Sequence, residues 1–134
     1  MSGKLLYLDS SAIVKLVVHE PESAALLALL EAWPDRISST LARVEVTRTL
    51  RRITASAADR LRGKQILDRL GLVRMEEEIL ATAAGLGPAE LRTLDAIHLA
   101  TALYVQGDLA GLVSYDRRLS EAASAANIPV LSPA

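Results

Sequence analysis

Three aspartates occupy positions where a carboxylate is unusual. Asp9 interrupts the apolar run LLYLDSSAIVKL, and Asp116 follows the apolar segment GLVSY. Each lies where a buried strand is expected to end and a helix to begin, which in parallel α/β sheets is the edge that faces the ligand crevice. If the two strands are parallel neighbours, their carboxyl ends bring Asp9 and Asp116 together. Asp9 on its own is equally consistent with a helix cap and with a site residue.

The third aspartate, Asp95, lies in the longest periodic stretch, LRTLDAIHLATALYV. A carboxylate on an inward helical face is costly unless it is paired, hydrogen-bonded or bound to a metal. Asp95 is therefore expected to bind a metal, to pair with an arginine or to make a capping contact, and His98 to be a hydrogen-bonded core residue. The residues that share the face of Asp95 at helical spacing are Leu91, Leu94, His98, Leu99 and Ala102.

The elements that must position these acids alternate between strands and helices. Strands are expected at 5–8, 35–38, 72–75, 111–116 and 128–131. One helix is expected to begin at Ser10 or Ser11. Further helices are expected to cover 20–33, 40–54, 56–71, 76–87, 88–107 and 117–127. This alternation predicts an α/β fold in which helices wrap a parallel sheet.

Composition limits the class of protein. A chain of 134 residues is expected to form one domain. Half of it is hydrophobic, a surplus that, with the nearly all-apolar helix 24–33, predicts a homodimer. No apolar run approaches the ~20 residues of a membrane span, and no signal peptide is evident. The absence of cysteine suits a cytoplasmic protein.

Charge is distributed unevenly along the chain. Residues 43–74 contain nine arginines and lysines but three acids, although the whole chain has a net charge of −1. This asymmetry suits a polyanionic partner, and the alternative is that the charges form the solvated faces of two helices.

Four segments, taken in order, resemble the PIN-domain nucleases, and especially the VapC-type toxins of prokaryotic toxin–antitoxin pairs. They are YLDSSAIVKL, SSTLARVE with Ser39 six residues before Glu45, LDAIHLATAL, and LVSYDRRL. The resemblance covers almost the whole chain. It implies a single PIN domain over 1–134, with a PIN-like three-layer α/β/α sandwich around a central four- to five-stranded parallel sheet.

The resemblance also implies a site. It maps the four acids of the family onto Asp9, Glu45, Asp95 and Asp116, and its small hydroxyl positions onto Ser10 and Ser114. Glu45 becomes a site residue only through the resemblance, because along its own helix it is expected to pair with Arg48 or Thr49. Of the four acids, Asp9, Asp95 and Asp116 are the expected metal ligands. An oxygen-rich set without cysteine suits Mg²⁺ or Mn²⁺.

The implied activity is metal-dependent endoribonucleolytic hydrolysis that leaves a 5′-phosphate and a 3′-hydroxyl. The implied partners are an RNA substrate and a cognate antitoxin protein whose tail covers the active-site groove. The arginines on or near the helix of Glu45 are expected to hold the RNA backbone. They are Arg43, Arg48, Arg51 and Arg52.

Three other classes of protein lack their required residues. A phospho-receiver domain needs an acceptor aspartate after a middle strand and a lysine ending the last strand, which RISST and IPVLSPA do not provide. A haloacid-dehalogenase phosphotransferase needs an acid where Ser11 stands, and a nucleotide binder needs a glycine-rich turn where DSSAIVK stands. A PIN fold used only for binding is the remaining alternative, and retention of all four acids argues against it.

Overall fold

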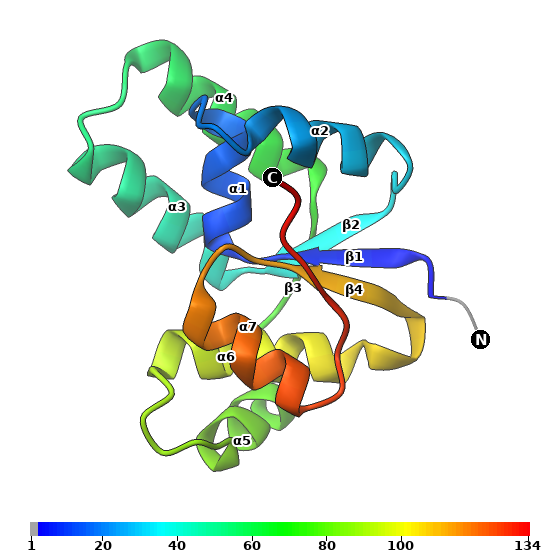
Figure 1. Ribbon diagram of the computed structural model, residues 1–134. Coiled ribbons are helices and arrows are strands. Elements are labelled where there is room, and N and C mark those ends of the chain that lie inside the picture. Colours follow the sequence, from blue (N-terminus) through cyan, green and yellow to red (C-terminus); the bar gives the residue numbers. More distant parts are fainter. Residues whose placement is uncertain (1–2) are drawn as a thin grey trace.

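The structure is a computed structural model that describes residues 3–134 as one five-stranded sheet with helices on both faces (Figure 1). All strand pairs are parallel, in the order β3-β2-β1-β4-β5. The strands are β1 (Leu5–Leu8), β2 (Arg36–Ser39), β3 (Gly71–Val73), β4 (Leu109–Val113) and β5 (Val130–Leu131). The parallel α/β sheet predicted from the alternation of elements is confirmed.

Helices cover both faces of the sheet and make the three layers of an α/β/α sandwich (Figure 1). One layer contains α1 (Ser10–Val17), α2 (Ser23–Glu31), α3 (Leu41–Arg52) and α4 (Ala57–Arg69). The other contains α5 (Glu77–Gly85), α6 (Thr93–Tyr104) and α7 (Arg117–Ala125), and a short 3₁₀ turn, Gln106–Asp108, precedes β4. Within the described residues, no helix has the length and apolar character that a membrane crossing requires.

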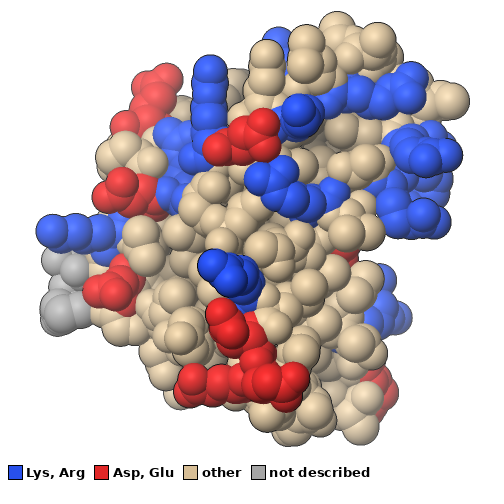
Figure 2. All heavy atoms as spheres, turned by 180° about the vertical axis from the view of Figure 1, so that it is seen from behind, with Lys and Arg blue, Asp and Glu red and all other residues tan. Residues whose placement is uncertain are grey.

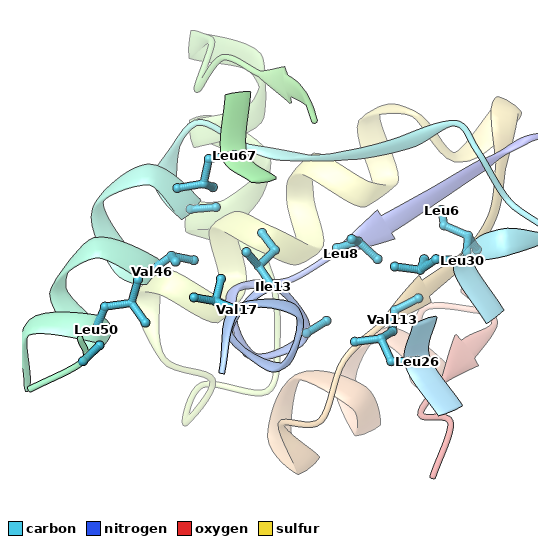
Figure 3. Close-up of a cluster of buried hydrophobic side chains, with 13 residues drawn as sticks. Leu6, Leu8, Ile13, Val17, Leu26, Leu30, Val46, Leu50, Leu67 and Val113 are labelled. Carbon is cyan, nitrogen blue, oxygen red and sulfur yellow. The ribbon is translucent and has the colours of Figure 1, made fainter. Parts of the chain in front are cut away.

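The two helical layers explain why β1 is apolar on both faces. Leu6 and Leu8 belong to the hydrophobic cluster beneath α1–α4 (Figure 3), whereas Tyr7 packs on the opposite face with Leu99 and Leu112. Successive side chains of a strand point to opposite faces, so a central strand between two layers is buried on both sides. The apolar run therefore ends only at Asp9, where the strand leaves the sheet.

Helices α3 and α4 pack closely because α4 carries a glycine at the contact. A Cβ atom at Gly63 would lie 2.8 Å from Cδ1 of Leu50. A glycine within a helix costs roughly 1 kcal/mol relative to alanine. The close approach that it allows places the two basic helices side by side.

The boundaries predicted from the sequence differ from the structure in two places near the predicted site residues. Helix α6 begins at Thr93, whereas the sequence predicted a helix from Pro88. The backbone N–H of Leu91 donates to the carbonyl of Pro88 at 2.9 Å, so 88–91 is a turn. Leu91 still packs against the core, which is why periodicity alone did not separate the turn from the helix. The strand predicted at 111–116 is Leu109–Val113, so Ser114 and Asp116 lie beyond its end.

Candidate active site

The ends of β1 and β4 meet as the sequence predicted. These strands are parallel neighbours, and the backbone N–H of Asp9 donates to the carbonyl of Val113 at 3.1 Å. The hydroxyl of Ser114 donates to Oδ2 of Asp9 at 2.6 Å and accepts the backbone N–H of Asp116 at 3.0 Å. In the sheet, β2 lies on one side of β1 and β4 on the other. The carboxyl ends of β1 and β4 therefore form a topological switch point, where α/β folds bind ligands.

Asp9 is a helix cap and also lines the cleft described below. Its Oδ1 accepts the backbone N–H of Ala12 at 2.9 Å, which caps α1, and the hydroxyl of Ser11 at 2.6 Å. The side chain is nearly fully buried. Burial raises the pKa of the Asp9 carboxyl more than the hydrogen bonds from Ser11, Ser114 and Ala12 lower it. Asp9 therefore caps α1 and lines the cleft at the same time.

Asp95 and Asp116 are joined by one arginine. Nε of Arg92 lies 2.9 Å from Oδ2 of Asp95, and Nη2 lies 2.6 Å from Oδ2 of Asp116. Hydrogen bonding and charge attraction from Asp95, with further attraction from Asp116, raise the pKa of Arg92. The arginine side chain is 55% exposed, whereas that of Asp95 is 11% exposed. Asp95 therefore pairs with an arginine, but the arginine is half exposed rather than buried.

Glu45 reaches the site from α3, on the other side of the cleft. Its Oε1 accepts the hydroxyl of Ser10 at 2.5 Å and lies 2.6 Å from Nε2 of His98. The pairing with Arg48 or Thr49 expected along the helix is wrong, because tertiary partners are available. Burial alone would raise the pKa of Glu45, but the hydrogen bonds from His98 and Ser10, with charge attraction from Arg92, outweigh it and lower the pKa. His98 is the hydrogen-bonded core residue that was predicted.

A single cleft of about 560 Å³ contains all four predicted acids. Lys15 lies on its wall, 2.9 Å from Oε1 of Glu22 and 4.8 Å from the ring centre of Tyr115. The carboxylates come from the two strand ends, α3 and α6, so the fold assembles acids distant in sequence. The predicted site residues that line this cleft are Asp9, Ser10, Glu45, Arg52, Asp95 and Asp116.

The arginines predicted to bind RNA do not share one surface. Arg52 follows Glu45 by seven residues, about two helical turns, and it lines the same cleft. Arg43 lies on a different face of α3 and pairs with Asp68 of α4 at 3.2 Å. Arg48 and Arg51 are exposed on α3. Figure 2 shows the lysine and arginine side chains gathered mostly over the part of the molecule formed by α3 and α4.

Comparison with known proteins places this arrangement in a family. The family model of the PIN domain matches residues 6–125. The chain belongs to the PIN-domain family. It is 50% identical over 128 residues to ribonuclease VapC46 of Mycobacterium tuberculosis, covering 96% of this chain and 97% of that protein. It is 39% identical over 119 residues to ribonuclease VapC47 of the same species, covering 86% and 87%.

Solved structures agree on the fold of this PIN domain. The sarcin–ricin loop cleaving toxin VapC20 of M. tuberculosis superposes with a TM-score of 0.74 at 15% identity, covering 96% of this chain and 99% of that one. A chain of a toxin–antitoxin complex from Klebsiella pneumoniae gives a TM-score of 0.71 at 22% identity, covering 96% and 98%. The predicted PIN-like fold and membership of the VapC group are thereby confirmed.

The oxygen atoms that line the cleft of this PIN domain suit a hard cation as ligands, but they do not converge on one point. Carboxylate and hydroxyl oxygens dominate the cleft, and the chain has no cysteine. Across residues 3–134, no three acidic or histidine side chains converge as the ligands of one metal ion. The reason is visible in the contacts, because the cationic guanidinium of Arg92 already joins Asp95 to Asp116. The residue types fit a divalent cation, provided that Arg92 releases these two carboxylates.

Sequence reasoning missed Arg92 and Tyr7 as parts of the site. Arg92 precedes Asp95 by three residues, a spacing that favours a side-chain pair on a helix, so the signal was present. Tyr7 gave no such signal, because its hydroxyl contacts Nδ1 of His98 across 91 positions of sequence. That contact depends on the packing of α6 against β1.

Proposed function

We propose that this PIN domain is a divalent-metal-dependent endoribonuclease and the toxin of a toxin–antitoxin pair, with Asp9, Glu45, Asp95 and Asp116 as its catalytic acids. The observation that carries the proposal is that these four acids, from separate elements, line one cleft at the switch point of the sheet. Support comes from relatives named ribonucleases at up to 50% identity. A ribonuclease with this role meets its RNA in the cytoplasm.

In this proposal Asp9, Asp95 and Asp116 hold Mg²⁺ or Mn²⁺. When bound, such a cation lowers the pKa of a water molecule and neutralises charge on a phosphate. Close carboxylates repel one another, and in the described structure the guanidinium of Arg92 offsets this repulsion between Asp95 and Asp116. Metal loading requires Arg92 to release both acids, after which its planar donors are available to a phosphate.

The other residues of the cleft have separate parts in the hydrolysis. Glu45, which has a lowered pKa, is a carboxylate at neutral pH and can accept a proton from the attacking water. The water oxygen bonds to phosphorus, the bond from phosphorus to the 3′ oxygen breaks, and that oxygen takes up a proton from the solvent in the open cleft. The products are a 5′-phosphate and a 3′-hydroxyl. Ser114 and Ser10 support the reaction by donating hydrogen bonds that orient Asp9 and Glu45, respectively.

The substrate and protein partners follow from the same proposal. Arg52 in the cleft would contact the RNA backbone, and Arg48 and Arg51, exposed on the same helix, would extend this contact. Arg43, on another face of α3 and paired with Asp68, would contact only RNA that continues onto that face. An antitoxin would inhibit by covering the cleft. A homodimer would bury exposed apolar side chains such as Leu27 on α2, which is 54% exposed.

The decisive experiment is cleavage of a mixed RNA pool by the purified chain in Mg²⁺, in Mn²⁺ and in EDTA. We expect cleavage with either metal and none in EDTA. Asp9→Asn should be inactive but folded, because asparagine also caps helices while it is a poorer cation ligand. Cleavage in EDTA, or wild-type cleavage by Asp9→Asn, would contradict the metal site. RNA binding without cleavage in any metal would favour the non-catalytic PIN module.

A further inference from the structure

Behind Glu45 lies a buried chain of hydrogen bonds that the proposed hydrolysis does not use directly. Nε2 of His98 lies 2.6 Å from Oε1 of Glu45, and Nδ1 of the same ring lies 2.7 Å from the hydroxyl of Tyr7. His98 is 2% exposed and Tyr7 is fully buried. The two rings meet edge to face, with centres 5.8 Å apart. The histidine therefore has both ring nitrogens engaged and a fixed ring plane.

The partners determine which nitrogen carries the hydrogen. An ionised carboxylate only accepts hydrogen bonds, so Nε2 must be the protonated nitrogen that donates to Glu45. Burial raises the pKa of Tyr7 far above its usual range, so this phenol keeps its proton. We take the imidazole as neutral, so that Nδ1 accepts the phenolic O–H of Tyr7. This assignment satisfies Tyr7, His98 and Glu45 together, with Tyr7 donating to His98 and His98 donating to Glu45.

The hydrogen bonds on Glu45 also distinguish its two oxygens. The hydroxyl of Ser10 and Nε2 of His98 both bind Oε1. Oε2 accepts no hydrogen bond from residues 3–134, and Glu45 lines the cleft. Two donors on one oxygen restrict rotation of the carboxylate and leave the other oxygen for a ligand in the cleft.

We propose that His98, itself held by the hydroxyl of Tyr7, is a positioning residue that fixes the carboxylate of Glu45 for reaction. The proposal rests on the proposed ribonuclease function, in which Glu45 is catalytic. His98 contacts no substrate in this account and acts through Glu45. Residues that hold a catalytic group without contacting the substrate typically contribute about 10- to 100-fold to activity, because they keep that group in its productive orientation.

Two substitutions at position 98 separate the hydrogen bond of His98 with Tyr7 from its hydrogen bond with Glu45. In His98→Gln the amide nitrogen can occupy the place of Nε2 and donate to Glu45, while the acceptor for Tyr7 is lost. In His98→Asn the shorter amide can accept from Tyr7 at the place of Nδ1, while the donor to Glu45 is lost. Both variants remove the ring and one hydrogen bond, so each is the control for the other.

The experiment measures kcat and KM for RNA cleavage by the wild type and both variants, together with melting temperature. Positioning predicts that His98→Asn lowers kcat about 10- to 100-fold with little change in KM, and that His98→Gln keeps most of kcat. Equal loss of kcat in both variants, at similar melting temperatures, would show a merely structural role and overturn the proposal. Wild-type kcat in His98→Asn would also overturn it.

A spectroscopic measurement tests the chain of hydrogen bonds without activity. In wild-type protein labelled with ¹⁵N-histidine, the ring of residue 98 should be protonated at Nε2 and unprotonated at Nδ1. The opposite tautomer would overturn the proposed direction of the hydrogen bonds. If the wild type cleaves no RNA in any metal, the ribonuclease proposal fails on its own, and the tautomer still decides whether His98 donates to Glu45.

Discussion

The two sides of the cleft hold their acids in different ways. On one side, Asp95 and Asp116 are held by the half-exposed guanidinium of Arg92. On the other side, Glu45 is held by buried His98, which is in turn held by Tyr7. Exposed ion pairs contribute about 0–1 kcal/mol, whereas a buried polar group left without its partner costs about 1–3 kcal/mol. We therefore infer that the side with Asp95 and Asp116 is exchangeable, because a metal cation can replace the guanidinium of Arg92 there. The side with Glu45 is fixed.

The largest effect expected from this difference concerns metal binding. Mn²⁺ at a hundredfold excess over its dissociation constant should stabilise the wild type by about 2.7 kcal/mol relative to EDTA. Arg92→Gln should bind Mn²⁺ more tightly, because no side-chain cation then competes for Asp95 and Asp116. Thermal melting across a Mn²⁺ titration measures both effects.

The control for charge removal is Arg117→Gln. The side chain of Arg117 is 88% exposed, and its charge pairs with Glu121 on α7. This variant should titrate with Mn²⁺ as the wild type does. Weaker Mn²⁺ binding by Arg92→Gln than by Arg117→Gln would mean that Arg92 assists the cation rather than competing with it, and the exchangeable side would be disproved.

A second, smaller effect compares the two sides in EDTA. Tyr7→Phe removes a buried hydroxyl and leaves Nδ1 of His98 without its donor, so unfolding free energy should fall by about 1–3 kcal/mol. Asp95→Asn should cost only about 0–1 kcal/mol, because Arg92 is half exposed and keeps its contact with Asp116. Urea unfolding at neutral pH measures both. A larger loss in Asp95→Asn than in Tyr7→Phe would reverse the assignment of the fixed side.

The sequence revealed the parts of the site that depend on local pattern. Asp9 and Asp116 each end a predicted strand, and Asp95 interrupts an apolar helical face, so their positions follow from periodicity and from parallel topology. The fold class followed from the same alternation of strands and helices. Glu45 had no local signal, and resemblance to a family was needed to single it out.

The parts that sequence reasoning missed depend on tertiary contacts. His98 meets Glu45 across 53 positions, and Tyr7 meets His98 across 91. No periodicity encodes such pairs, because they arise only when α3, α6 and β1 pack together. Arg92 escaped notice for a related reason. Its three-residue spacing from Asp95 was a local signal, but the contact with Asp116 that makes it part of the site spans 24 positions.

The smallest expected effect separates the cleft from the basic surface around it. Arg52 lines the cleft, whereas Arg43 is paired with Asp68 on the other side of α3. Each phosphate contact to single-stranded RNA contributes about 0.7 to the slope of log affinity against log salt. Arg52→Ala should therefore reduce this slope by about 0.7. Arg43→Ala should change it less, because the charge of Arg43 is already partly neutralised by Asp68.

The measurement is RNA binding at several salt concentrations in EDTA, which keeps the RNA intact if cleavage requires metal. Arg43 and Arg52 lie on the same helix and are both exposed, so the two variants differ chiefly in the face that loses a charge. A common electrostatic field over α3 and α4 would give equal reductions, because such a field depends on net charge rather than on position. Equal slopes would therefore place the RNA along the whole basic surface, and a reduction confined to Arg52→Ala would place it in the cleft beside the acids.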